Sequence, residues 1–275
     1  MPGWCIRRNW GTDMDKSKLL DRAASGEERL LLARILDKWE QADRRGAPAC
    51  TEFLSPRERM AAETLLRLAA VPVNRWAASG GYEGAERQII AFLPEWQEPE
   101  DAVFPIRCLR AAFRPEYELT HRDILGSLMG EGIVREKVGD ILVTEGCCDI
   151  VAAESVADHL LMGWNTAGRA KLTVTEIDPT HLHIPVQRTE QVRDTVAALR
   201  LDAVASSGFR MARGKAAALI ESGRVQVNWQ ECVKPDRLLA EGDTVSARGV
   251  GKFRLTEVGG LTKKGRISIL LERYV

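Results

Sequence analysis

Residues 209–228 restrict the possible folds of this chain more than any other segment. Three apolar residues recur at the spacing i, i+3, i+4 and share one helix face: Ala216, Leu219 and Ile220. Gly223 follows at the position where helices commonly end in a left-handed residue. Val225 and Val227 then alternate with polar residues, which is the period of a half-buried strand. The segment therefore predicts a basic turn, a short helix, a glycine stop and a strand.

A second short helix is predicted directly upstream. Its apolar-periodic pattern begins at Arg200-Leu201-Asp202 and ends at Gly208. Four cations crowd onto the two helices, the turn between them and the start of the strand: Arg210, Arg213, Lys215 and Arg224. Positive charge beside polar strand ends is what a nucleic-acid phosphate backbone would meet.

The distribution of charge supports this interpretation although the chain as a whole is neutral, with 39 Lys and Arg against 39 Asp and Glu. Residues 200–275 hold 14 basic and 8 acidic side chains, a net charge of +6, and the remainder carries −6. Positive charge is thus concentrated at the predicted helical pair, and the local field matters more for binding than the total.

Two short helices joined by an arginine-rich turn, followed by a Val-Asn strand, resemble the S-four (alpha-L) RNA-binding module. That module is also found in tyrosyl-tRNA synthetases and pseudouridine synthases. The matching residues are Arg200, Leu201, Asp202, Arg210, Arg213, Lys215, Ala216, Ile220, Gly223, Val225, Val227, Asn228, Pro235, Gly242 and Asp243.

The length predicts two or three domains, and the order of predicted helices and strands predicts an α+β fold class. We expect a helical N-terminal unit over residues 14–70, a middle α+β sheet domain over 71–180, and a C-terminal S-four module over 181–275 with further short strands. Helix starts are predicted at Ser25, with Glu28 reaching back, and at Ser55-Pro56. The predicted order of elements in the middle domain is strand, helix, strand, strand, helix, strand. This order favours one mixed or antiparallel sheet.

Three motifs of the middle domain extend the resemblance: Gly80-Gly81-Tyr82, Thr120-His-Arg-Asp-Ile-Leu-Gly-Ser-Leu-Met-Gly130, and Gly132-Ile-x-Arg-Glu-Lys-x-Gly-Asp-Ile-Leu-Val143. With the S-four module they look like the YlmH family of bacterial proteins. The resemblance implies a non-catalytic factor of ribosome-associated quality control. It implies binding to ribosomal RNA and tRNA on an obstructed large subunit, support for C-terminal alanine tails, and quality-control proteins as possible partners.

The candidate RNA contacts fall into two groups. The S-four module supplies Arg200, Arg210, Arg213, Lys215, Arg224 and Asn228. The middle domain supplies Arg122, Arg135 and Lys137, for which a salt-bridged surface is an equal alternative. Guanidinium groups take phosphates bidentately, whereas a lysine acts as a point charge. Asn228 either donates to a phosphate or holds the end of its strand.

No catalytic residue, metal site or cofactor is predicted. His121 and Asp123 begin a helix, His181 and His183 lack another evident metal ligand, and no Cys-x-x-Cys pair occurs. Two other classes of function remain open. Pseudouridine synthases also carry an Arg-Leu-Asp catalytic stretch, so an RNA-modifying enzyme is one alternative. In those enzymes the stretch runs into a Thr-Ser-Gly-like segment, whereas here residues 203–208 lead into the basic turn, which favours a structural Asp202. A protein-interaction scaffold is the other alternative.

The remaining expectations concern the cellular setting. The six cysteines are interpreted as free thiols in a reducing cytosol. The sequence shows no apolar run of membrane-spanning length, which predicts a cytoplasmic protein without a membrane partner. We expect a monomer, and Met14 is a candidate alternative start.

Overall fold

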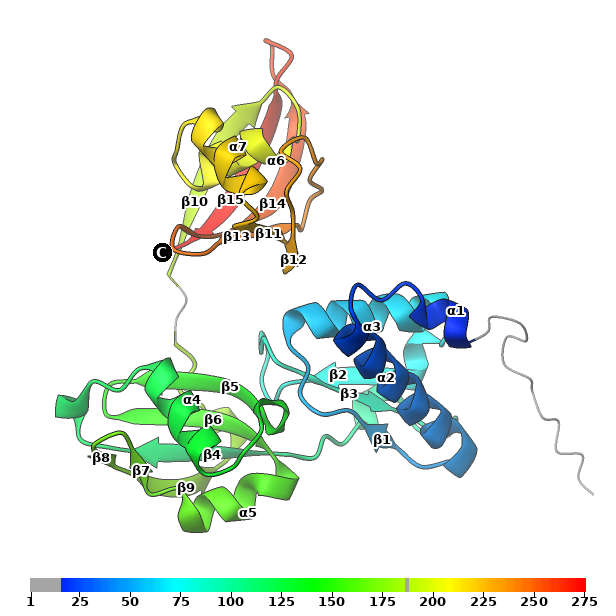
Figure 1. The fold of residues 1–275 in the computed structure, drawn as a ribbon, viewed down its shortest axis with the longest axis vertical. Coiled ribbons are helices and arrows are strands. Elements are labelled where there is room, and N and C mark those ends of the chain that lie inside the picture. The colour runs from blue at the N-terminus through cyan, green and yellow to red at the C-terminus, as the bar shows by residue number, and fades with distance from the viewer. Residues whose placement is uncertain (1–15, 186–187) are drawn as a thin grey trace, which may run out of the picture. The chain divides into compact units, whose positions relative to one another are not determined.

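A computed structural model describes residues 16–185 and 188–275 of the chain. Its contacts divide the chain into two compact units, residues 1–185 and 186–275, coloured blue to green and yellow to red in Figure 1. Met14, the candidate alternative start, lies outside the described residues.

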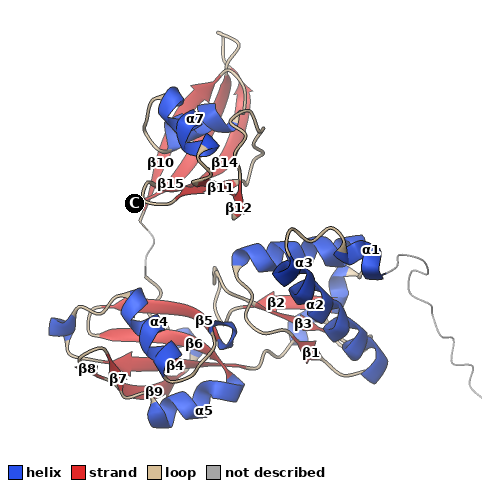
Figure 2. Cartoon of the chain, in the orientation of Figure 1, coloured by secondary structure: helices blue, strands red, loops and turns tan. Residues whose placement is uncertain are grey.

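The N-terminal part of the first unit combines helices with a small antiparallel sheet (Figure 2). The helices are α1 (Lys16–Leu20), α2 (Gly26–Arg45) and α3 (Pro56–Leu68). The strands, in the spatial order β1-β3-β2, are β1 (Ala49–Cys50), β2 (Trp76–Ser79) and β3 (Ile89–Phe92). Ile35 and Leu66 of the helices share one core with Ile90 and Phe92 of β3. The apolar helix faces are therefore buried against a sheet that continues beyond residue 70, the expected domain boundary.

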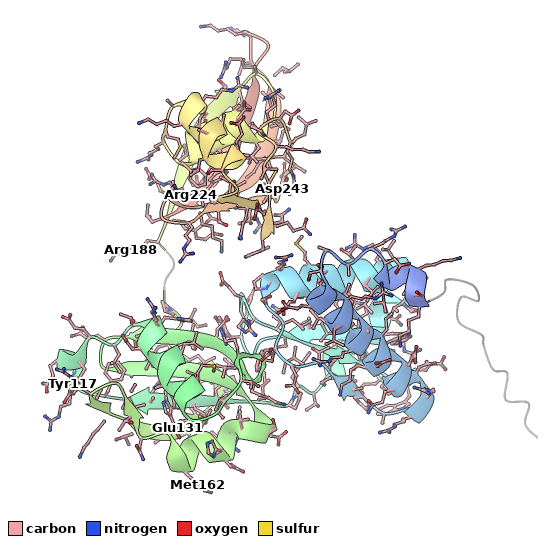
Figure 3. The ribbon with its side chains drawn as sticks, in the orientation of Figure 1. Tyr117, Glu131, Met162, Arg188, Arg224 and Asp243 are labelled. Atoms are coloured by element: carbon pink, nitrogen blue, oxygen red, sulfur yellow. The ribbon has the colours of Figure 1, made fainter. Side chains whose placement is uncertain are left out.

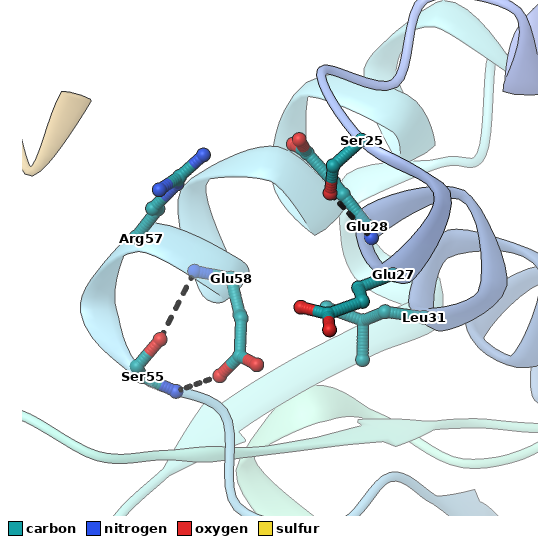
Figure 4. A pocket seen from close by; sticks show the side chains of 7 residues that line it. All are labelled: Ser25, Glu27, Glu28, Leu31, Ser55, Arg57 and Glu58. Atoms are coloured by element: carbon teal, nitrogen blue, oxygen red, sulfur yellow. Dashed lines mark hydrogen bonds between the residues drawn. The ribbon is translucent and has the colours of Figure 1, made fainter. Parts of the chain in front are cut away.

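Both long helices begin at the predicted serines (Figure 4). Ser55 Oγ accepts the Glu58 N–H at 3.3 Å, and the Ser55 N–H donates to the Glu58 carboxylate at 2.7 Å, which closes a capping box. Ser25 Oγ likewise accepts the Glu28 N–H at 3.1 Å. The Glu28 carboxylate reaches back one residue further than predicted, to the N–H of Ala24 at 3.0 Å.

The rest of the first unit is a four-stranded antiparallel sheet in the order β5-β6-β4-β9, with two helices and a short hairpin. The strands are β4 (Ile106–Ala112), β5 (Val138–Thr144), β6 (Cys147–Ala153) and β9 (Thr173–Ile177). The helices are α4 (His121–Gly130) and α5 (Glu154–Gly163). The hairpin is formed by β7 (Thr166–Ala167) and β8 (Ala170–Lys171). The predicted order of strands and helices is observed.

This sheet has an apolar core on each face. On one face, Ile124 of α4 and Leu160 of α5 share a core with Ile150 of β6. On the other face, Val151 shares a core with Phe53 from the N-terminal part. A Cβ added at Gly139 would lie 2.7 Å from the Phe53 ring, so a glycine is required where β5 approaches this ring. These contacts join the N-terminal part and the sheet into one unit.

The second unit is a six-stranded antiparallel sheet in the order β10-β15-β14-β13-β11-β12. The strands are β10 (Thr189–Val196), β11 (Val225–Val227), β12 (Gln230–Glu231), β13 (Thr244–Ala247), β14 (Gly251–Leu261) and β15 (Ile267–Tyr274). Two helices, α6 (Leu201–Gly208) and α7 (Arg213–Glu221), pack on one face of the sheet (Figures 1 and 2). The pattern of residues 191–199 alone is ambiguous between strand and helix, and the resemblance favours a strand. Residues 191–196 lie in β10, whereas residues 197–199 lie beyond its end.

Short 3-10 turns connect several elements of the first unit: η1 (Val73–Arg75), η2 (Pro99–Asp101), η3 (Pro115–Tyr117), η4 (Arg135–Lys137) and η5 (Pro179–His181). The α+β class is confirmed, with a helical N-terminal region, a middle sheet and a C-terminal helical pair on a sheet. Across residues 16–185 and 188–275, none of the helices has the length and apolar content needed to cross a bilayer.

Candidate nucleic-acid interface

The connection between α6 and α7, which we term the basic elbow (residues 208–215), is shaped by close packing on the sheet. A Cβ at Gly208 would lie 2.4 Å from the Phe253 ring, so the end of α6 can approach β14 only with glycine there. Phe209 then packs edge-on against Phe253, with ring centroids 5.0 Å apart. The next residue, Arg210, takes a left-handed backbone with φ +52° and has an exposed side chain. Burial of Phe209 thus presents Arg210 at the surface.

Asp202 organises two of the predicted RNA-binding arginines. Its buried carboxylate accepts the Arg200 guanidinium at 3.1 and 3.2 Å and the Arg213 guanidinium at 2.9 and 3.0 Å. Burial opposes ionisation, but these hydrogen bonds outweigh it, so the pKa of Asp202 lies below its usual value. Both arginines keep part of their side chains in solvent. Their positions are therefore fixed before any ligand arrives.

Arg210 has a partner that the sequence does not reveal. Its guanidinium forms an ion pair with Glu190 of β10. Glu190 lies 20 residues upstream and faces the helices only because of the strand pairing between β10 and β15, in which it lies opposite Arg273. No local pattern predicts such a pair, because only the fold brings the two residues together.

Lys215 and Arg224 complete the positive side of this unit. Lys215 is exposed in the first turn of α7. Arg224, labelled in Figure 3, is also exposed and donates to the carbonyl of Arg248 at 3.1 Å. The residue that precedes α7 is Ala212, which has no side-chain acceptor for the first N–H groups of the helix. A helix start that has no side-chain cap and carries Arg213 and Lys215 in its first turn has the geometry and charge that favour an anion.

Asn228 holds the end of its strand. Its amide nitrogen donates to Asp243 at 2.7 Å, and its amide oxygen accepts the Thr244 N–H at 2.9 Å. These bonds tie β11 to the turn before β13, where Asp243 is labelled in Figure 3. Of the two roles that the sequence leaves open, the geometry favours the structural one.

The three candidates from the middle domain have different surroundings. Arg122 is exposed on α4. Lys137 forms an ion pair with Glu52 at 2.6 Å. Arg135 is partly buried and donates to the carbonyls of Val138 and Gly139. Burial, reinforced by the neighbouring Arg87, lowers the pKa of Arg135 to about 10. Arg135 thus fastens η4 to β5, and we leave it out of the proposed interface.

The glycine-rich motif and the 132–143 motif form one structural clasp that sequence reasoning missed. The Asp140 carboxylate accepts the Tyr82 hydroxyl at 2.7 Å and the N–H groups of Glu86 and Arg87. The Arg87 guanidinium donates in return to the carbonyls of Phe53, Val138 and Arg135. Two of the motifs that carry the family resemblance therefore contain residues that stabilise the fold.

A Cys-Asp-His cluster is also brought together only by the fold. Cys147, Asp149 and His183 lie close enough to share an ion. The Asp149 carboxylate is fully buried, binds the Arg110 guanidinium at 2.7 Å through both oxygens, and accepts the His183 backbone N–H at 2.7 Å. Asp149 is thus already neutralised and hydrogen-bonded. The cluster fastens residues 181–183 to the sheet, and Arg110 adds a bond to the His181 carbonyl at 2.6 Å.

A pair of short helices on a twisted sheet, with arginines fixed around their connection, defines an RNA-binding protein of the S-four class. Comparisons with known families agree. Residues 199–245 match the model described as "S4 domain", residues 27–95 match "YlmH, N-terminal", and residues 99–181 match "Putative RNA-binding domain in YlmH". The chain belongs to the YlmH family.

A relative from Bacillus subtilis points the same way. The chain is 37% identical over 224 residues to "Ribosome-associated protein quality control protein P2" of Bacillus subtilis (strain 168), and the match covers 81% of this chain and 86% of that protein. A solved structure, "Cell division protein ylmH from Streptococcus pneumoniae", matches 58% of this chain and 96% of its own at 25% identity, with a TM-score of 0.49.

Proposed function

We propose that this protein is a non-catalytic RNA-binding factor that docks on ribosomal RNA and tRNA of the large ribosomal subunit. In this role it would act in ribosome-associated quality control and support the addition of C-terminal alanine tails to stalled chains. The observation that carries the proposal is the basic elbow, where Arg210 and Arg213 are held by carboxylates at the start of α7, together with Arg200, which shares Asp202 with Arg213.

The elbow suits a structured RNA better than a sequence-specific one. Guanidinium groups in fixed positions and the first N–H groups of α7 are both suited to donate hydrogen bonds to phosphate oxygens. Such contacts read the shape and backbone of folded RNA rather than its bases. The relative from Bacillus subtilis is named for ribosome-associated quality control, which makes ribosomal RNA the first ligand to test.

The surroundings of Asp202 favour a non-catalytic role over the pseudouridine-synthase alternative. Asp202 is 5% exposed, and both carboxylate oxygens bind arginine. Its Oδ1 also accepts the N–H of Ala203 at 2.9 Å. A nucleophile must reach its substrate, whereas this carboxylate is enclosed by the two cations that it positions.

Sedimentation of the purified protein with large subunits, with and without bound peptidyl-tRNA, over a series of salt concentrations tests the proposal. We expect binding that favours the tRNA-loaded subunit and weakens steeply with salt, because released counterions make phosphate contacts salt-dependent. Absence of binding to both forms of the subunit would contradict the proposal.

Lys215→Glu is the sharpest variant, because Lys215 is exposed whereas charge reversal at Arg213 would place a second carboxylate beside Asp202. We expect Lys215→Glu to reduce affinity about tenfold or more and to leave thermal unfolding nearly unchanged. Arg22→Glu makes the same charge change at an exposed residue between α1 and α2 and serves as the control. Equal loss of binding in both variants would show only an effect of total charge.

The protein-interaction scaffold remains as a second candidate because the first unit offers a cleft beside α2. This cleft has a volume of about 640 Å³ and is lined by Leu30, Leu31, Ile35 and Phe53 together with several carboxylates. Ribosome association that is insensitive to salt and to Lys215→Glu would favour this alternative.

A further inference from the structure

The six-stranded sheet of the second unit has a face that its own helices do not cover. Side chains alternate across a strand, and Phe253 and Leu255 of β14 are buried beneath α6 and α7. Lys252 and Arg254 therefore point to the opposite face. Strand pairing places one row of side chains across this face: Gln226, Ser246, Lys252 and Tyr274. Within residues 188–275, both helices lie on the Phe253 side.

An unusual turn places an aromatic ring beside this row. β11 and β12 are joined by the two-residue turn Asn228-Trp229, in which both residues have positive φ, +51° and +60°. Turns of this type normally carry glycine at one or both central positions, and a tryptophan there is strained. The turn persists because the Asn228 side chain is bonded to Asp243 and Thr244. Trp229 remains partly exposed and is not part of the buried core beneath the helices.

Lys252 lies between two aromatic rings. Its ammonium group is 5.8 Å from the centre of the Trp229 ring and 4.9 Å from the centre of the Tyr274 ring. Both rings are partly exposed, as is the lysine. Arg254 lies on the same face, opposite Glu272. Lys252 is the cation that lies close to both rings. Aromatic rings that flank a cation provide stacking surfaces for bases and a charge for the phosphate between them.

We propose that Trp229, Lys252 and Tyr274 form a second RNA-binding surface, which takes an unpaired stretch of RNA. Bases stack on the Trp229 and Tyr274 rings, and Lys252 contacts the intervening phosphate. The proposal rests on the RNA-binding function proposed above and adds a ligand of different form. The basic elbow binds the backbone of folded RNA, whereas the sheet face binds nucleotides that are not paired.

Fluorescence anisotropy with the full chain and a labelled oligouridylate or oligoadenylate of about ten nucleotides tests this surface. Trp229→Gly removes the ring and supplies the residue that the turn prefers, so we expect no loss in thermal stability. Tyr274→Leu removes the second ring and keeps an apolar side chain. We expect each of these two variants to weaken single-strand binding about tenfold. Lys252→Gln should make the slope of log affinity against log salt concentration shallower by the amount that corresponds to about one phosphate contact.

Lys215→Glu is the matched control, because it changes the basic elbow and leaves the sheet face intact. We expect it to weaken large-subunit binding more than oligonucleotide binding. Oligonucleotide affinity that is absent in the wild type, or unchanged in both Trp229→Gly and Tyr274→Leu, would overturn the inference even when the wild type sediments with large subunits. Ring-dependent oligonucleotide binding without any large-subunit binding would support this surface and overturn only the proposed ribosomal role.

Discussion

Asp202 shows how a single buried carboxylate holds two cations of the proposed RNA-binding surface. It fixes Arg200 and Arg213 in the folded protein, so under the proposed function a bound phosphate need not order either guanidinium. The same pairs make the position sensitive to substitution, because removal of the negative charge would leave two cations close together with weaker hydrogen bonds.

Asp202→Asn should therefore lower the free energy of unfolding by about 1–2 kcal/mol at neutral pH. Urea unfolding followed by circular dichroism would measure the change. Asp236→Asn, which neutralises an exposed carboxyl in the same unit, should have an effect within about 0.5 kcal/mol.

The difference in unfolding free energy between wild type and Asp202→Asn should depend on pH, because the pKa of Asp202 is lowered in the folded protein. A carboxyl with a depressed pKa stabilises the fold above its unfolded pKa of about 3.9, and this contribution is lost as pH falls through the folded pKa. The difference in unfolding free energy between wild type and Asp202→Asn should thus be constant near pH 7 and shrink below about pH 4. A constant difference across that range would contradict the assigned ion pairs.

At the scale of elements, the clasp of Tyr82, Arg87 and Asp140 joins the glycine-rich turn to β5 and to the segment that carries Phe53. Arg87 is partly buried, and its guanidinium serves three backbone carbonyls that belong to different segments. Backbone carbonyls in such a position need donors, because an unpaired buried polar group is costly.

Arg87→Ala should therefore lower the free energy of unfolding of the first unit by about 2–4 kcal/mol. The loss should appear in chemical denaturation as a lower midpoint with little change in slope. Arg122→Ala, at an exposed position on α4, should change stability by no more than about 0.5 kcal/mol. Equal stability of the two variants would show that the clasp is not needed for folding.

At the scale of the whole molecule, the two units have separate cores. The second unit has one buried cluster of its own, and the clusters of the first unit are formed by residues 19–182. Residues 188–275 also contain the basic elbow and, from residue 200 onward, the net charge of +6.

A fragment of residues 188–275 should fold alone and bind folded RNA with the same salt dependence as the full chain, because it contains the basic elbow, where we propose the principal phosphate contacts. Circular dichroism would test its folding, and filter binding over a salt series would give the slope. The same fragment with Lys215→Glu is the control. A markedly shallower slope than that of the full chain would show that the first unit contributes cations, with Arg122 and Lys137 as the first to examine.

Several local features were predictable because they depend on near neighbours in the chain. A helix starts at Ser55-Pro56 as expected, and the apolar spacing of Ala216 and Ile220 gives the expected buried helix face. The periodicity near residue 191 was ambiguous, and only the family resemblance favoured the strand that β10 forms. Glycine positions were informative for turns, yet they did not show that Gly139 and Gly208 are required by aromatic rings from distant segments.

The amino-acid sequence alone is enough to infer the class of the protein, the positions of most helices and strands, and the concentration of cations near residues 200–224. These properties depend on local periodicity, capping and charge, which neighbouring residues specify. The partners of individual cations become known only from the fold: Glu190 pairs with Arg210, Asp149 pairs with Arg110, and Lys252 lies between Trp229 and Tyr274. These contacts depend on strand register and on packing across the sheets, which bring together residues far apart in the chain.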